Sequence, residues 1–159
     1  MKKNILFINA ESNSANGVCV NNIAECLKER YNVFIITNMT REKHMNNGVS
    51  EYYVKPRLYN RLVAKQINNR LAAKAVQKFA WVINKAKLLM SFFSWPLISP
   101  LYTFRIYRQE KKLHKKYHFD YIVPVYTLVD GLIATKFLKK KYNDFVYIPY
   151  LLDAFSGGY

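Results

Sequence analysis

The first polar loop of the chain carries residues that could bind an anion. Ser14, Asn16 and Gly17 follow the apolar run KNILFINA and precede a helical pattern. A glycine before a helix lets the backbone approach a ligand closely, and the unpaired N–H groups of a helix amino terminus attract negative charge. The spacing matches neither a dinucleotide fingerprint nor a P-loop. The loop therefore predicts a phosphate-binding turn or, equally, a turn whose Ser and Asn side chains cap the helix.

Polar residues also follow the last two predicted strands. Asp153 comes directly after the final one, where a carboxylate could orient an acceptor hydroxyl, act as a general base, or cap a following helix. Tyr126 and Thr127 follow the preceding strand and could contact a substrate. Asp130 is expected at the cap or in the first turn of the next helix. Asp153 is the candidate catalytic residue, and the candidate substrate- or phosphate-binding residues are Ser14, Asn16, Gly17, Tyr126 and Thr127.

The histidines and cysteines indicate no catalytic or metal site. His44, His114 and His118 lie in polar, basic segments, where we expect them to be solvated. They form no Ser-His-Asp arrangement and no cluster with metal-ligand spacing, so we expect no metal and no bound cofactor. Cys19 and Cys26 are seven residues apart, which matches no zinc or redox signature. They predict reduced side chains with a packing role.

The positive charge is concentrated in one segment. The chain has 25 Lys and Arg against 10 Asp and Glu, a net charge of +15. Between Lys55 and His118 lie 15 of these basic residues and a single acid, Glu110, which account for +14 of that charge. Such a segment is expected to face an anionic partner: nucleic acid, a membrane surface or a phosphorylated substrate.

Aromatic and apolar residues are interleaved with these cations. At a membrane the apolar side chains would enter the headgroup boundary while Lys and Arg met anionic lipids. On single-stranded nucleic acid the same mixture would stack bases and neutralise phosphates. The apolar mass of residues 88–101 and the lack of a nucleic-acid module favour the membrane. Two alternatives remain for this segment: a surface that binds a partner protein, or a solvated face that covers a core hairpin. The candidate membrane residues are Trp81, Lys85, Lys87, Phe92, Phe93, Trp95, Arg105 and Arg108.

The uncharged run from Leu88 to Phe104 is too short to span a bilayer. It has 17 residues and contains Pro96 and Pro100, whereas a spanning helix needs ~20 apolar residues. We therefore expect an interfacial patch or a buried helix hairpin. Because no secretory signal is visible at the amino terminus, the protein is expected to be cytoplasmic and peripheral on the inner face of the membrane.

The predicted elements alternate between strand and helix. Strands are expected at residues 5–8, 32–38, 51–56 and 119–126 and from residue 144 onward, and helices at 18–31, 57–87, 105–116 and 129–142. This order predicts a single α/β domain over residues 1–159, with an open, mostly parallel Rossmann-like sheet and flanking helices. Residues 57–118 are expected to form a basic, apolar helical insertion between the strands at 51–56 and 119–126. Ligands of such sheets bind beyond the carboxyl ends of the strands.

The same order resembles a known family. The chain begins KKNILFINA, Gly17 opens a helix that ends CLKERY before NVFIIT, and the last third reads FDYIVPVYTLVDGLIATKFLKKKYNDFVYIPYLLDAF. This arrangement is similar to the amino-terminal domain of GT-B glycosyltransferases, in particular the retaining, family-4-like group. The resemblance covers the entire chain and rests on the order of its elements. The chain departs from the family in two places. Asn16 precedes Gly17 where the family often has two adjacent glycines, and Tyr126 and Thr127 stand where many members have a histidine.

The resemblance implies a specific function. The loop at Asn16 and Gly17 would approach the phosphates of a sugar-nucleotide donor, the domain would hold the acceptor, and the basic segment would dock on an anionic membrane or a lipid-linked acceptor. The donor-binding domain of the family would follow Tyr159, so we expect the 159 residues alone to be inactive and a second chain to be a possible source of that domain. The expected role is the synthesis of cell-surface polysaccharide or glycolipid. The alternative is a non-catalytic module that binds an anionic membrane or a partner enzyme.

Overall fold

The chain divides into two compact units. In the computed structural model, residues 2–9, 15–38, 48–56, 78, 81–82, 99–126 and 129–151 are described. The first unit comprises Met1–Lys55 and Pro100–Tyr159, and the second comprises Pro56–Ser99. Within the second unit, Lys78, Trp81 and Val82 have helical conformation and exposed side chains.

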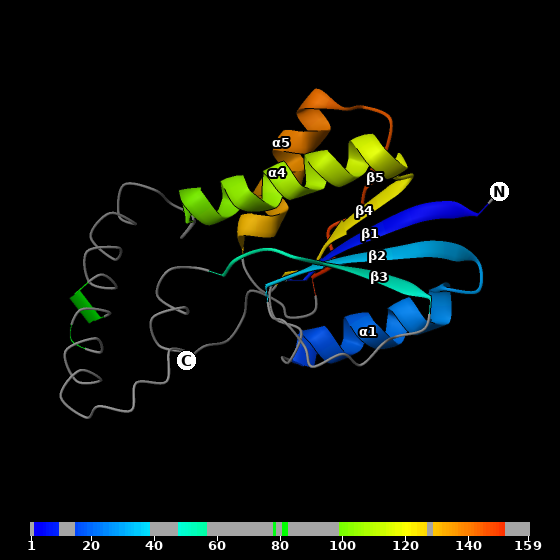
Figure 1. Ribbon diagram of the computed structural model, residues 1–159, viewed down its shortest axis with the longest axis horizontal. Helices are drawn as coiled ribbons and strands as arrows, with labels where there is room; N and C mark the ends of the chain where they lie inside the picture. The colour runs from blue at the N-terminus through cyan, green and yellow to red at the C-terminus, as the bar shows by residue number, and fades with distance from the viewer. Residues whose placement is uncertain are drawn as a thin grey trace. The chain divides into compact units, whose positions relative to one another are not determined.

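The first unit contains a five-stranded sheet in which all strand pairs are parallel. Its elements are β1 (Lys3–Asn9), α1 (Ala15–Leu27), β2 (Tyr31–Thr37), β3 (Val49–Tyr53), α4 (Pro100–Tyr117), β4 (Tyr121–Pro124), α5 (Val129–Lys141) and β5 (Val146–Tyr147). The strand order is β3-β2-β1-β4-β5, with an isolated bridge between Val125 and Tyr150 beyond the last pair. The structure confirms the predicted open α/β sheet with flanking helices and helical chain between the third and fourth strands (Figure 1).

The central strand is buried on both faces. Ile5 and Phe7 of β1 pack on the same side as Val20 and Ala24 of α1. Leu6 and Ile8 point the other way, into the core that α4 and α5 cover. Figure 1 shows α1 on one side of the sheet and α4 and α5 on the opposite side. Because successive side chains of a strand alternate between faces, a central parallel strand must be apolar at every position, as the run ILFI is.

Aromatic side chains hold α4 over β2 and β3. The ring of Phe34 in β2 lies 4.7 Å from that of Tyr117 and 5.2 Å from that of Phe119, between ring centres. The hydroxyls of Tyr52 and Tyr117 are 2.8 Å apart and share a hydrogen bond. Offset and edge-to-face aromatic pairs stabilise contacts beyond the area they bury. These contacts fix the carboxyl end of α4 against this half of the sheet.

The helix α4 begins at Pro100, so the predicted start at Arg105 is wrong. Proline fits the first turn of a helix because an N–H there has no intrahelical partner. The earlier start adds part of the uncharged run to the helix. Leu101 and Phe104 are 73% and 55% exposed, while Tyr102 and Ile106 are buried against the sheet. This end of α4 is therefore apolar on both its inner and its outer side.

Buried polar pairs join α4 to α5. The Thr103 hydroxyl donates to a carboxylate oxygen of Asp130 at 2.8 Å, and the Thr135 hydroxyl donates to a carboxyl oxygen of Glu110 at 3.0 Å. Asp130 is the second residue of α5, which confirms the prediction that it lies in the first turn. All four residues are buried, and hydrogen bonding is what makes burial of such groups tolerable.

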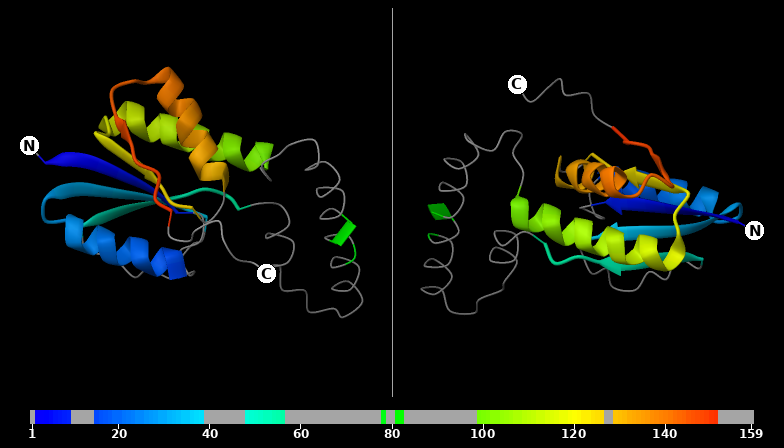
Figure 2. Two further views of the ribbon diagram at one scale, coloured as in Figure 1. Left: turned by 180° about the vertical axis from the view of Figure 1, so that it is seen from behind. Right: turned by 90° about the horizontal axis from the view of Figure 1, so that it is seen from above.

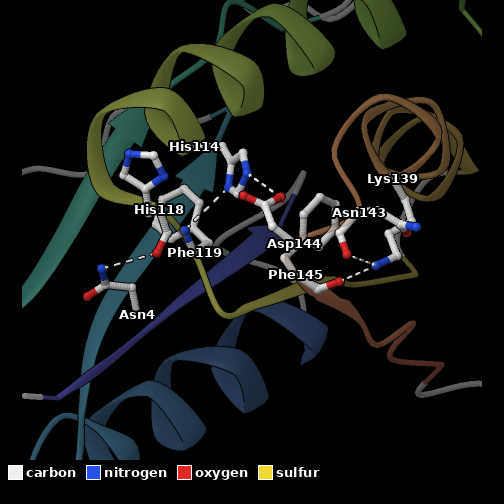
Figure 3. Close-up of polar contacts among 8 residues, drawn as sticks. All are labelled: Asn4, His114, His118, Phe119, Lys139, Asn143, Asp144 and Phe145. Atoms are coloured by element: carbon white, nitrogen blue, oxygen red, sulfur yellow. Dashed lines mark hydrogen bonds and ion pairs between the residues drawn. The ribbon is translucent and has the colours of Figure 1, made fainter.

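His114 is buried, so its predicted solvated position is wrong. It is 2% exposed and its Nε2 lies 3.0 Å from a carboxylate oxygen of Asp144. The backbone N–H of Phe119 donates to Nδ1 at 3.3 Å, so Nδ1 is the acceptor and Nε2 carries the proton toward Asp144. Figure 3 shows this pair beside a bond from the Asn4 side chain to the His118 carbonyl and a bond from Lys139 to the Asn143 carbonyl. These contacts tie together the segments that lead into β4 and β5.

Burial of Glu110 makes stability depend on pH. Burial raises the pKa of its carboxyl from 4.5 to about 8, although the hydrogen bond from Thr135 opposes the shift. The unfolded chain releases this proton near 4.5 while the folded chain keeps it to about 8. Stability should therefore fall as pH rises between these values, by at most about 1.4 kcal/mol per pH unit from this group.

Glu110→Gln removes the titrating proton and should flatten this fall. The measurement is the free energy of unfolding in urea at several pH values between the two pKa values, for wild type and variant. Glu51→Gln is the matched control, because Glu51 has an exposed side chain in β3. An equal pH slope in wild type and Glu110→Gln would contradict the assignment.

Candidate functional site

The order in which the chain adds strands to the sheet reverses at β1. From β1 the chain moves to β2 and β3 on one side, and then crosses to β4 and β5 on the other. The segments that leave the carboxyl ends of β1 and β4 therefore diverge, which in open parallel sheets leaves the crevice where ligands bind. Asn9 ends β1, and Ile8 pairs with Pro124 at the end of β4. This edge is the candidate ligand site.

Asn16 and Tyr126 meet at this edge. The Asn16 side-chain amide donates to the backbone carbonyl of Tyr126 at 3.1 Å, across 110 residues of chain. The backbone N–H of Tyr126 donates to the carbonyl of Tyr150 at 2.8 Å. Tyr126 thus links the segments that follow β1, β4 and β5. The structure brings these two predicted site residues together through the backbone of Tyr126.

Asn16 and Gly17 lie inside α1, because the helix begins at Ala15. The prediction that they precede the helix is therefore wrong by about one turn. Gly17 is buried in the described part of α1. The Asn16 side-chain N–H donates to the segment after β4, and its position inside the helix excludes Asn16 as the N-cap. The first turn of α1 still lies at the crevice edge, since Asn16 in that turn contacts the segment after β4.

Buried polar residues end β1 and β2, and the sequence analysis did not single them out. Asn9 is 1% exposed and pairs in register with Thr37, which is also buried. Asn38 follows Thr37 and is buried as well. The signal was available, because both apolar runs end in Asn: FIN in β1 and IITN in β2. Amides at this position can donate to or accept from a ligand without a change of charge.

The basic and aromatic candidates fall into different parts of the structure. Trp81 belongs to the second unit and is exposed, while Arg105 and Arg108 belong to α4. The Arg108 guanidinium lies over the Phe104 ring, 5.8 Å from its centre. Beside it is a hollow of about 400 Å³, lined by Phe104, Tyr107, Arg108, Lys111, Lys112 and Lys115. Ser14, Lys85, Lys87, Phe92, Phe93, Trp95, Thr127 and Asp153 lie outside the described residues, as does His44.

The described part of the crevice edge is suited to binding. It offers amides and backbone groups, whereas the nearby carboxylate of Asp130 is fully buried and accepts from Thr103. Asp130 therefore fixes the amino-terminal turns of α4 and α5 against each other. The described residues contain no group of three or more His, Cys, Asp or Glu side chains that could hold a metal ion. Cys19 and Cys26 are reduced and exposed on α1, so the predicted packing role is wrong.

The membrane prediction can be compared with the helices. Within the ranges that the structure describes, no helix is both long and apolar enough to cross a bilayer. The longest described helix, α4, has 18 residues, and cations occupy much of its second half.

The bond from Asn16 should stabilise the junction of the three segments. Asn16→Ala removes it and should lower the free energy of unfolding by about 1 kcal/mol, as measured by urea unfolding. Asn22→Ala is the control, because Asn22 is an exposed residue of the same helix and undergoes the same side-chain truncation. Equal effects of the two substitutions would contradict a role for the Asn16 amide.

Comparison with known protein families finds no family model that matches this chain, and comparison with curated proteins finds no significant sequence match.

Proposed function

We propose that this chain is the acceptor-binding and membrane-docking half of a sugar-nucleotide-dependent glycosyltransferase that acts in cell-surface polysaccharide or glycolipid synthesis. The observation that carries the proposal is the outer face of α4. Leu101, Phe104 and Arg108 follow one another at helical spacing on the exposed side, and Lys112 and Lys115 continue that side. The helix therefore has an apolar end and a basic end on a single exposed stripe.

This stripe, Leu101, Phe104, Arg108, Lys112 and Lys115, has the chemistry of an interfacial helix. Apolar side chains gain about 25 cal/mol for each Å² that they bury in the headgroup boundary. Each Lys or Arg near an anionic surface adds about 1 kcal/mol. The stripe lies on a helix that covers one face of the sheet (Figure 2), so α5 and the sheet support it from behind.

The crevice edge supports the acceptor-binding and donor-facing part of the proposal. A transferase of two Rossmann-like domains works in the cleft between them, and the loops at the carboxyl ends of the strands line that cleft. Here Asn16 and Tyr126 join the segments after β1 and β4 at that edge. The amino terminus of α1 would favour a phosphate there.

A non-catalytic docking module is the second candidate, and the same stripe favours it. Such a module would bind an anionic membrane or a partner enzyme and would need no crevice. Nucleic acid is a weaker candidate, because Leu101 cannot stack on a base and Phe104 is the single aromatic side chain of the stripe. The two candidates differ in whether supplying a donor-binding domain produces turnover.

Phe104→Ser should weaken binding to anionic vesicles by up to about tenfold, because full burial of a Phe side chain is worth ~1.5–3 kcal/mol and only the exposed half of Phe104 is left to bury. Co-sedimentation with vesicles of neutral and anionic phospholipid measures this. Phe137→Ser is the matched control, because Phe137 on α5 is 54% exposed against 55% for Phe104. Added salt should weaken binding of all three proteins. Equal loss in the two variants, or stronger binding to single-stranded DNA than to vesicles, would contradict docking through α4.

The 159-residue polypeptide alone should transfer no sugar from sugar nucleotides to a polyprenyl-phosphate-linked acceptor. The physical reason is that one Rossmann-like domain cannot close a cleft or exclude water from the reacting groups. Turnover should appear when a donor-binding domain is supplied as a second chain. Turnover by the 159 residues alone would contradict the division of labour proposed here. If no donor-binding domain supplied as a second chain produced turnover, the result would favour the docking module.

A further inference from the structure

A second concave surface lies beside α4, toward the end of β3. It is a groove of about 570 Å³, which is in the range of small-molecule sites, roughly 300–1,000 Å³. All of its described lining residues belong to the first unit. The groove shares Arg108 and Lys112 with the docking stripe, whereas Arg105 lines the groove and is not part of the stripe.

One wall of the groove is a face of α4. Arg105, Arg108, Gln109 and Lys112 line it. Their spacing of three, one and three residues places them on one face of the helix. The adjacent face of α4, about a quarter turn away, packs into the core through Tyr102, Ile106 and Leu113. The buried face thus holds the orientation of this wall.

The other wall is the segment that leaves β3. Tyr53, Val54 and Lys55 line it. The backbone N–H of Val54 donates to the carbonyl of Thr37 at 2.8 Å, and the Val54 side chain is part of the core. This bond continues the pairing of β2 with β3 by one residue, so Lys55 leaves the sheet from a fixed point. The groove therefore has two supported walls that are about fifty residues apart in the chain.

The charge of the groove has one sign. Lys55, Arg105, Arg108 and Lys112 are cationic, and none of the other described lining residues is acidic. Lys55, Arg108 and Lys112 repel one another around this common hollow, and a concave surface concentrates their potential. A bound anion would relieve that repulsion. Gln109 and Tyr53 add uncharged hydrogen-bonding groups in the same space.

We propose that this groove binds the phosphate or diphosphate group of a ligand. A guanidinium group matches a phosphate with two parallel hydrogen bonds, and lysine contributes a point charge from the opposite wall. A diphosphate has two anionic centres, one of which could contact each wall. The inference deepens the docking part of the proposed function, and it rests on that function only if the phosphate is carried by a lipid.

The test is a calorimetric titration of the full chain with inorganic pyrophosphate at fixed ionic strength. Wild type should bind one equivalent saturably. Lys55→Gln and Arg108→Gln should each weaken binding about tenfold, the usual loss of one charge-assisted contact. Lys136→Gln should leave it unchanged, because Lys136 is an exposed residue of α5 outside the groove. Thermal unfolding of each variant checks that it is folded.

The result that overturns the groove is equal weakening by Lys55→Gln and Lys136→Gln, or no saturable binding by wild type. Either would mean that the cations act only as a diffuse field. The Lys55 substitution changes the groove and leaves the docking stripe intact, because Lys55 lies on the β3 wall and not on α4.

Vesicles containing phosphatidic acid distinguish the two sources of phosphate. If a lipid supplies it, Lys55→Gln should weaken vesicle binding about tenfold, and pyrophosphate should compete with the vesicles. If a soluble ligand supplies it, Lys55→Gln should weaken pyrophosphate binding alone. Vesicle binding that depends on Phe104 and not on Lys55, with no pyrophosphate binding, would overturn the groove and keep the docking proposal. Saturable pyrophosphate binding without vesicle binding would support the groove and contradict the docking proposal.

Discussion

Parallel pairing of β1 on both of its edges is the constraint from which the other elements take their positions. Ile5 pairs with Val33 of β2 on one side and with Tyr121 of β4 on the other. A strand with neighbours on both edges and helices on both faces has no contact with solvent along its middle, so only apolar side chains fit there. Because β2 and β4 lie on opposite edges of β1, the strand order also reverses at β1, and the crevice lies beyond its carboxyl end. Core and crevice therefore have one origin.

The helix α4 connects the core to the charged surface. Its inner side carries Ile106 and Leu113 together with the buried polar residues Glu110 and His114, each of which bonds to a different later segment. Polar contacts of this kind need particular partners, so they fix rotation about the helix axis more closely than apolar packing does. That rotation sets the positions of the cations: Arg105 lines the groove, Lys115 lies on the exposed stripe, and Arg108 and Lys112 belong to both.

The strands and the fold class could be predicted because their signal is local. Runs such as NVFIITN are β-branched and apolar on both faces, and no helical periodicity competes with them. Helix boundaries were less predictable. Pro100 was interpreted as an interruption of the apolar run, although a proline suits the first turn of a helix. The start of α1 was placed late for a similar reason, since the polar residues before Val18 resemble a loop.

The site could be predicted only in part, because its contacts join distant segments. The approximate region followed from the rule for parallel sheets, and Asn16 and Tyr126 were both identified. The bond between them was not, since it depends on a backbone carbonyl 110 residues away. The burial of His114 was missed for the same reason, because its partner Asp144 follows 30 residues later in a turn. The β3 wall of the groove is set by Val54, whose bond to Thr37 requires the sheet to be known.

The crossover to β4 also explains how the fold can carry an insertion. The backbone of Asn4 bonds to Asp120, 116 residues later, so the chain closes a very long loop whatever lies within it. The entropy of closing a flexible loop grows only with the logarithm of its length, and doubling the loop adds roughly 0.6 kcal/mol. Residues between β3 and α4 can therefore be gained or lost over evolution at little cost in folding free energy. This part of the chain is free to diverge while β1 keeps its neighbours.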